Sequence, residues 1–278
     1  MRTVPSFLEA VILGGVQGLT EFLPVSSSAH LVFVQHLLGF SGENLVFFDV
    51  ILHLGTLAAL FVYFAGDVAH LLRDSLYGVS YLVRRKSLAD IADIAPHSRW
   101  ALGILVACVP TGLAGIFLKD WFEAMFGSLK TVGWALLGTS AFLWLTRYFQ
   151  RDERGIDRAQ YLDFFLIGLF QAAAITPGIS RSGATIAAAL FLGLKREDAF
   201  RFSFLLAIPA ILGAGLVELK DGLAGWSGGW PPLAAGFLAA ALVGLASLWA
   251  LSRIMRKGKL HYFAFYTLLF ALIVLSQK

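Results

Sequence analysis

The chain has 278 residues, of which 58% are hydrophobic and only 14% are charged, and its mean hydropathy is +0.75. Soluble domains carry roughly 45–50% apolar and about 25% charged residues, so this composition excludes a soluble enzyme and a disordered protein. Long apolar stretches separated by short turns predict an all-α polytopic membrane protein rather than a barrel of alternating strands. The single Cys108 excludes an internal disulfide. A membrane is the expected environment, and we expect no nucleic-acid partner.

The first apolar region covers residues 7–38, which is too long for one membrane span and is interrupted by Pro24 and three serines. A second region, 163–194, is interrupted in the same way by Pro177 and a serine–arginine–serine motif. Proline stops the incoming helix, and a serine can cap the outgoing one. We therefore expect two re-entrant helix–loop–helix hairpins, each entering and leaving the membrane on the same side.

Six further apolar stretches are long enough to cross a membrane. Between the first two, residues 67–84 form an amphipathic stretch that we expect at the membrane interface. Together with the hairpins, these elements predict a single membrane domain over residues 1–278. The six expected spans lie at about 48–65, 100–118, 131–149, 202–219, 233–252 and 260–276.

Basic residues divide unequally between the two sides of this layout. One side carries 16 of the 22 Lys and Arg residues and the other carries 5, with one arginine set apart inside the second hairpin. By the positive-inside rule the side with 16 is cytoplasmic, which places residues 84–99 and 147–160 in the cytoplasm. Successive loops fall on the correct sides of the membrane only if both hairpins enter and leave on the same side. Both termini and the loops around Gly42, Trp121 and Gly225 then face outward.

The two hairpin regions resemble each other at an offset of about 154 residues, close to half of the chain. A Gly-x-x-Gln pattern ending at Gln17 precedes the first break, and one ending at Gln171 precedes the second. Each half, about 1–150 and 160–278, then has one re-entrant hairpin and three spans, and the odd number of spans inverts the second half. Broken helices in inverted repeats mark a central binding site in transporters. We expect the two hairpin tips to meet near the membrane midplane.

Arg181 lies in the second break. An arginine at the membrane centre costs ~2.5–3.5 kcal/mol on insertion scales, so it needs a partner or a function. Ser180, Ser182 and Thr185 accompany it at the start of a helix. A guanidinium, hydroxyls and free N–H groups at a helix start all favour an anion, above all phosphate. The alternative is a purely structural ion pair between Arg181 and Glu21.

Glu21, Ser27 and His30 lie within ten residues at the first break. Ser27 and His30 are three residues apart, so both can lie on one face of the outgoing helix. A hydroxyl, an imidazole and a carboxylate suit nucleophilic or general acid–base hydrolysis. Taken alone, the pattern has a plainer interpretation, in which the serine caps a helix and the histidine belongs to the core.

The two tips, Glu21 to His30 (EFLPVSSSAH) and Pro177 to Thr185 (PGISRSGAT), look like the two signature motifs of the bacterial undecaprenyl-diphosphate phosphatase family, the bacitracin-resistance proteins. The resemblance covers essentially the whole chain. It implies an enzyme of the bacterial plasma (inner) membrane that removes the terminal phosphate of undecaprenyl diphosphate and so recycles the lipid carrier of peptidoglycan synthesis. It also implies paired re-entrant hairpins and a homodimer.

The resemblance gives each motif residue a role in this chain. Gln17 stands where many members have Glu, so Glu21 is the only carboxylate of the motif and the one candidate ligand for Mg²⁺ or Ca²⁺. Ser27 is the expected nucleophile with His30 as its acid/base partner, in a site open to the outer side; direct attack by water is the alternative. The expected catalytic residues are Glu21, Ser27, His30 and Arg181, and the expected phosphate-binding residues are Gln17, Ser26, Ser180, Arg181, Ser182 and Thr185.

Two other classes of protein compete with this interpretation. A polyprenyl-phosphate transporter or flippase would explain the inverted repeat, but it would not need a Ser/His pair beside a phosphate site. An anion channel would need a continuous polar pore, yet five of the six expected spans lack charge in their interiors. Phosphate release by purified protein in detergent separates hydrolysis from transport.

Overall fold

The structure, a computed structural model, describes residues 2–40, 43–83, 98–149 and 154–277, which form helices joined by turns, with no strand among them. The predicted loops around Gly42 and over most of 84–99, and part of 147–160, lie outside the described residues. The first half contains α1 (Phe7–Phe22), α2 (Ser27–Leu37), α3 (Glu43–Tyr63), α4 (Ala65–Val83), α6 (Ser98–Phe117), α7 (Lys119–Phe126) and α8 (Leu129–Leu145). The second half contains α9 (Tyr161–Ala173), α10 (Arg181–Phe191), α11 (Arg196–Gly225), α12 (Trp230–Arg256) and α13 (Phe263–Ser276). The all-helical prediction is confirmed.

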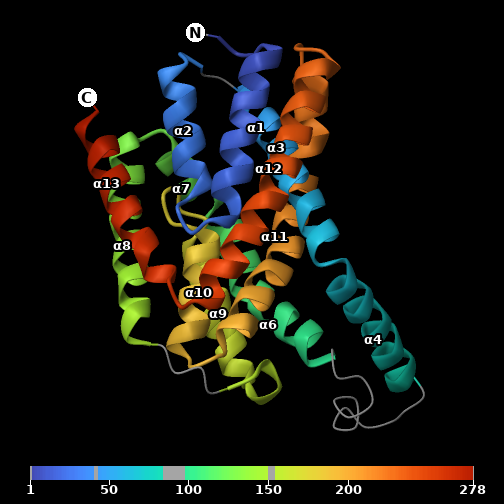
Figure 1. Cartoon of the computed structure of the whole chain (residues 1–278). Coiled ribbons are helices and arrows are strands. Elements are labelled where there is room, and N and C mark those ends of the chain that lie inside the picture. Colours follow the sequence, from blue (N-terminus) through green and yellow to red (C-terminus); the bar gives the residue numbers. More distant parts are fainter. Residues whose placement is uncertain (1, 41–42, 84–97, 150–153, 278) are drawn as a thin grey trace.

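Both interrupted regions form helical hairpins. α1 and α2 are joined by residues 23–26, and α9 and α10 by residues 174–180. In each hairpin a serine caps the outgoing helix: the Oγ of Ser26 accepts from the amide of Ala29 at 3.4 Å, and that of Ser180 from the amide of Gly183 at 3.2 Å. The hairpins come from opposite ends of the molecule and their tips meet in its middle (Figure 1).

Four helices in the described part of the chain are long and apolar enough to cross a membrane, and they coincide with four of the six expected spans. The other two expected spans, 131–149 and 260–276, contain shorter α-helices, because the chain changes to a 3₁₀ turn at one end of each. The α-helix has 17 residues in α8 and 14 in α13. The four long apolar segments are Leu45–Tyr63, Ser98–Phe117, Arg196–Leu216 and Trp230–Arg256.

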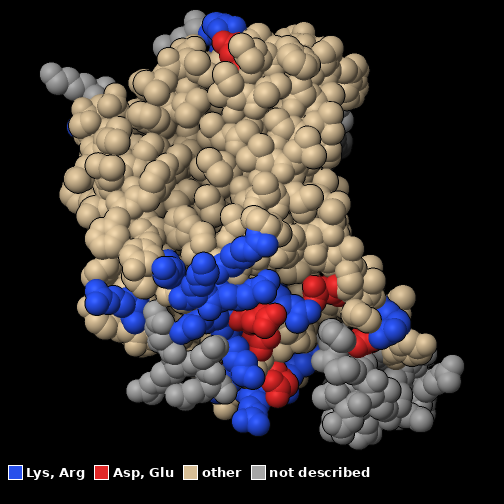
Figure 2. All heavy atoms as spheres, in the orientation of Figure 1, with Lys and Arg blue, Asp and Glu red and all other residues tan. Residues whose placement is uncertain are grey.

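Charge gathers at one end of the molecule. On the face shown in Figure 2 the coloured Lys and Arg side chains gather mainly at the lower end, whereas both chain termini lie at the upper end in Figure 1. Some of these basic groups tie helices together: Arg201 of α11 pairs with Asp67 of α4, and Arg154 pairs with Asp163 of α9 at 3.2 Å. The distribution agrees with the division of basic residues predicted from the sequence.

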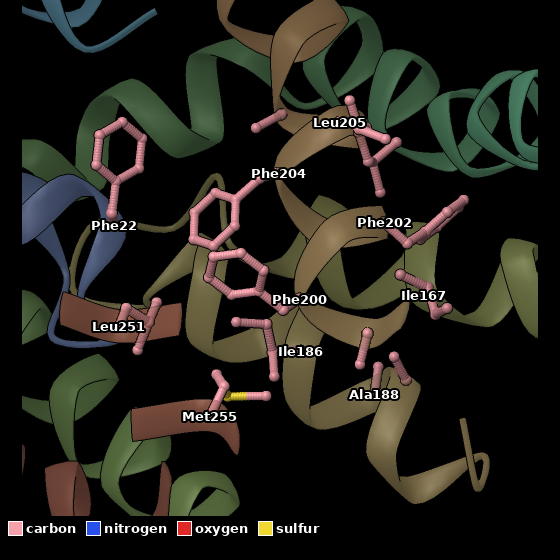
Figure 3. Close-up of a cluster of buried hydrophobic side chains, with 14 of the residues drawn as sticks. Phe22, Ile167, Ile186, Ala188, Phe200, Phe202, Phe204, Leu205, Leu251 and Met255 are labelled. Atoms are coloured by element: carbon pink, nitrogen blue, oxygen red, sulfur yellow. The ribbon is translucent and has the colours of Figure 1, made fainter. Parts of the chain in front are cut away.

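A buried apolar cluster packs the end of α1 against α10, α11 and α12 (Figure 3). Phe22, at the end of α1, meets the ring of Phe204 of α11 edge to face, with 5.5 Å between centroids. Phe200, Ile186 and Met255 surround them, and none of these five side chains is more than 5% exposed. The cluster thus joins the first hairpin to three helices of the second half.

Glycines let each hairpin approach a long helix of the other half. A Cβ on Gly14 of α1 would overlap the carbonyl of Gly236 of α12, and a Cβ on Gly168 of α9 would overlap the carbonyl of Ala107 of α6. Gly14 and Gly168 are 154 residues apart, which is the offset of the sequence repeat. The same close helix crossing therefore occurs at matching positions of the two halves.

We expect Gly14→Ala to destabilise the protein, because the added methyl group would force α1 away from α12. Overpacking of this kind costs about 1–3 kcal/mol. Gly15→Ala is the matched control, since no atom lies within 4 Å of its Cβ position and alanine favours a helix more than glycine does. Thermal unfolding of both variants in one detergent checks the prediction. Equal melting temperatures for the two would contradict the close crossing.

Candidate active site

An ion pair between the two hairpin tips forms the centre of the site. Nη2 of Arg181, the first residue of α10, lies 2.7 Å from Oε1 of Glu21 near the end of α1. The side chains are 16% and 5% exposed. A buried carboxylate or guanidinium is expensive without a partner of opposite charge. The pair predicted as one alternative from the sequence is therefore present, and it holds together residues that are 160 positions apart.

The second carboxylate oxygen of Glu21 accepts from Ser27. The Ser27 Oγ donates to Oε2 at 2.6 Å, and the fully buried Gln17 donates its amide N–H to the same oxygen at 3.1 Å. A carboxylate that accepts a hydroxyl proton at this distance is placed to act as the base for that hydroxyl. Ser27 thus faces Glu21, with Arg181 on the other carboxylate oxygen.

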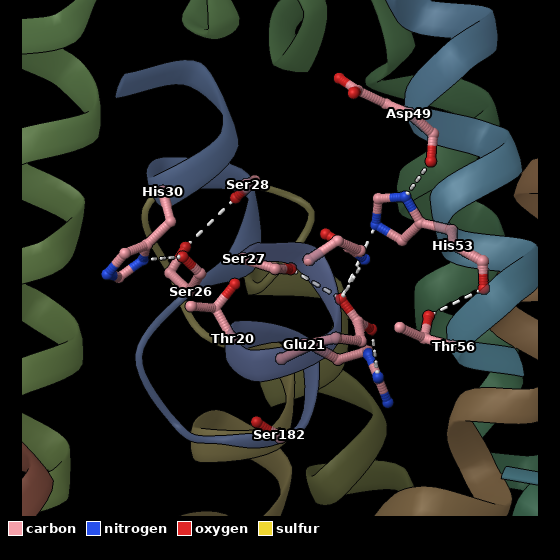
Figure 4. Close-up of polar contacts among 12 residues, drawn as sticks. Thr20, Glu21, Ser26, Ser27, Ser28, His30, Asp49, His53, Thr56 and Ser182 are labelled. Atoms are coloured by element: carbon pink, nitrogen blue, oxygen red, sulfur yellow. Dashed lines mark hydrogen bonds and ion pairs between the residues drawn. The ribbon is translucent and has the colours of Figure 1, made fainter. Parts of the chain in front are cut away.

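His30 lies elsewhere. Its Nδ1 is 2.7 Å from the main-chain oxygen of Ser26, its Nε2 is 2.8 Å from the Tyr266 hydroxyl, and its ring stacks on Phe270 with 4.0 Å between centroids. Figure 4 shows the His30 ring pointing away from Ser27, so the structure does not bring this pair together. Ser27 and His30 are three residues apart and lie near one face of α2, but their side chains point in different directions.

The contact between His30 and Ser26 supports a strained turn. Ser26 has φ of 68°, the one positive φ among the described non-glycine residues. Such a conformation persists where surrounding contacts hold it. The His30 ring N–H that donates to the Ser26 carbonyl provides one such contact, and this turn presents Ser27 to Glu21.

The remaining predicted phosphate ligands of the second hairpin are engaged within the protein. Ser180 caps α10 and its amide donates to Thr139 at 3.1 Å, while the Ser182 hydroxyl donates to the carbonyl of Leu23 at 3.4 Å. Thr185 bonds to the Arg181 carbonyl at 2.9 Å and to Ser203 at 2.5 Å. These three side chains are no more than 2% exposed, and their hydrogen bonds hold the hairpin tips in place.

Two polar side-chain atoms at the centre have no hydrogen-bond partner among the described residues. Nη1 of Arg181 and Oε1 of Gln17 are buried and make no hydrogen bond within the described structure. Helices α2 and α10 both begin at the tips, so their positive dipole ends converge there. A free guanidinium N–H beside two helix N-termini favours an anion. The arrangement fits a phosphate group next to Ser27.

A second histidine, which was not predicted from the sequence, lies at this centre. His53 of α3 has its Nε2 3.7 Å from Oε2 of Glu21, and its Nδ1 lies 2.8 Å from the main-chain oxygen of Asp49. Asp49 in turn accepts from Gln35 of α2 at 2.7 Å. The available signal was an Asp and a His four residues apart inside an apolar span, where polar pairs are rare.

The groups around Glu21 do not fit a resident Mg²⁺ or Ca²⁺. Such ions take about six or more oxygen ligands, mostly carboxylates and carbonyls. Among the described residues, no three His, Cys, Asp or Glu side chains come close enough to hold a metal ion. A cation on Glu21 would also meet the charge of Arg181 at Oε1.

Fold and site together define a polytopic helical membrane protein with a buried polar centre suited to phosphate. The chain matches the family described as bacitracin resistance protein BacA over residues 10–273, and it belongs to that family. It is 46% identical over 268 residues to the undecaprenyl-diphosphatase of Desulfosudis oleivorans, covering 93% of this chain and 94% of that protein. It is 41% identical over 261 residues to the undecaprenyl-diphosphatase of Alkaliphilus metalliredigens, covering 93% and 94%.

Proposed function

We propose that this chain hydrolyses undecaprenyl diphosphate to undecaprenyl phosphate and inorganic phosphate at the centre formed by Glu21, Ser27 and Arg181. The observation that carries the proposal is one buried carboxylate that joins a hydroxyl at 2.6 Å to an arginine at 2.7 Å. Membership of the family and the names of the relatives support the substrate and the reaction. The product is the lipid carrier used in peptidoglycan synthesis.

In the first step, Ser27 Oγ attacks the terminal phosphorus of the diphosphate. The O–H proton passes to Glu21 Oε2, a new O–P bond forms, and the anhydride bond breaks to release the polyprenyl phosphate. The free N–H groups of Arg181 and the N-terminus of α10 stabilise the charge on the transferring phosphoryl oxygens. Water then hydrolyses the phosphoserine and restores the Ser27 hydroxyl.

We further propose that each hairpin is re-entrant and that the halves, about 1–150 and 160–278, are inverted repeats within one membrane domain. Two observations support this: α1 packs on α12 of the other half as α9 packs on α6, and a serine caps both outgoing hairpin helices. Homodimer formation is a prediction from the family resemblance, which the mass of the protein in detergent tests.

We propose that the site opens toward the end that carries both termini, on the outer side of the bacterial plasma membrane. Phe22, at the first tip, and Phe200, four residues after Arg196, belong to one buried apolar cluster, which supports closure toward the basic end. The side chain of His53, at the edge of the site, is 35% exposed, and α3 begins at the end with the termini (Figure 1). A polyprenyl-phosphate transporter would need a second opening through the apolar cluster, and no described contact favours one.

If Ser27 is the nucleophile, Ser27→Ala should lower the rate of phosphate release by about 10³-fold or more and abolish a phosphoenzyme. Purified protein in detergent, given a polyprenyl diphosphate labelled in its terminal phosphate, provides both readouts, and no transport can occur there. Ser28→Ala is the matched control, because Ser28 joins the tips through Gly178 and does not face Glu21. A Ser27→Ala variant with a tenth of the wild-type rate would assign the attack to water.

The proposed orientation predicts the labelling of single cysteines in a Cys108→Ala background. Ser227, between α11 and α12, lies at the outer end, and Lys257, after α12, lies at the basic end; both are exposed. An impermeant maleimide should label Ser227→Cys in intact cells, and it should label Lys257→Cys only after the membrane is disrupted. The reverse pattern would overturn the orientation.

A further inference from the structure

His53 lies beside the proposed nucleophile and base without a role in the scheme above. Its Nε2 is 3.7 Å from Glu21 Oε2, the same oxygen that accepts the Ser27 hydroxyl at 2.6 Å. Figure 4 shows the imidazole between Asp49 on one side and Glu21 on the other. Glu21 Oε2 is therefore the meeting point of a hydroxyl from α2 and an imidazole from α3.

The main chain fixes which ring nitrogen of His53 carries the hydrogen. Nδ1 lies 2.8 Å from the carbonyl oxygen of Asp49, and a carbonyl only accepts hydrogen bonds. Nδ1 is thus the donor, and the neutral ring presents a lone pair at Nε2. The lone pair of Nε2 faces the Glu21 carboxylate oxygen, and the two atoms attract each other only when a proton lies between them. Nε2 is therefore oriented to take up a proton from Glu21.

The charged groups around His53 come from three elements. Glu21 of α1 faces Nε2, Arg181 of α10 lies behind Glu21, and the Asp49 carboxylate, one turn away on α3, is bound by Gln35. The neighbours of His53 on α3 face small or apolar residues: Gly55 lies against Phe237 and Ala240 of α12, and Leu54 lies near Gly215 of α11. Among the described residues, the Glu21 carboxylate is the acidic side chain paired with His53.

We propose that His53 is a positioning residue that acts through Glu21 as the terminal acceptor of the Ser27 proton. This inference rests on the proposed function. As the Ser27 O–P bond forms and the anhydride bond breaks, the hydroxyl proton passes to Glu21 Oε2 and then to His53 Nε2. Glu21 thereby stays ionised opposite Arg181. When water hydrolyses the phosphoserine, the proton it releases passes to the departing Ser27 oxygen, and His53 returns its own proton to the solvent.

The test is the pH dependence of phosphate release by purified protein from a polyprenyl diphosphate. His53→Gln keeps a polar side chain of similar length but cannot take up a proton. We expect kcat to fall about 100-fold near neutral pH, within the range for an acid–base group, with KM changed less than about twofold. Protonation would remove the acceptor nitrogen of His53, so the wild-type kcat/KM should show an acid limb that His53→Gln lacks.

His36→Gln is the matched control, because His36 is an exposed histidine near the end of α2, and its profile should be that of the wild type. A His53→Gln variant that keeps the wild-type profile would overturn the proposal, and so would a His30→Gln variant that alone loses the acid limb. If His53→Gln unfolds below the assay temperature, His53→Ala is assayed instead, with and without added imidazole. Imidazole should restore part of the phosphate release, and no restoration would contradict the proposal. A wild-type protein that releases no phosphate at any pH would instead contradict the proposed function.

Discussion

The ion pair between Glu21 and Arg181 is the constraint on which the arrangement of the site depends. It joins two hairpins that come from opposite ends of the molecule and whose paired residues are 160 positions apart. Each charge is buried and would be costly alone, so the hairpins must meet at this point. Their meeting aligns Ser27 with Glu21 and directs the N-termini of α2 and α10 to one place. The Glu21–Arg181 ion pair therefore both joins the two hairpins and arranges the groups of the proposed active site.

The two halves share a scaffold but differ in the side chains that carry the chemistry. Ser26 and Ser180 cap the outgoing helices at matching positions, and the next residue is Ser27 in the first half and Arg181 in the second. The proposed nucleophile and the proposed phosphate ligand thus start equivalent helices. At the repeat offset of 154, Glu21 corresponds to Ile175 and His53 to Ala207, so the acid–base groups belong to the first half alone.

The breaks, the long spans and the charge division could be predicted from the sequence, because proline, hydropathy and basic residues act locally. The partner of Arg181 could also be proposed, since a buried arginine needs an acidic group and Glu21 stands at the other break. The direction of the His30 side chain could not, because it depends on Tyr266 of α13 and on the strained turn at Ser26. His53 was missed for the same reason, since only the packing of α3 on α1 brings it to Glu21.

The most direct test is a double-mutant cycle of Glu21→Gln and Arg181→Met, with thermal unfolding and phosphate release measured for all four proteins in one detergent. Each single change leaves one buried charge unpaired, so each should cost about 3–5 kcal/mol of stability. The double variant should recover most of that stability, because no buried charge remains, and it should stay inactive because base and phosphate ligand are both lost. Single variants as stable as the wild type, or a double variant with restored phosphate release, would contradict the account.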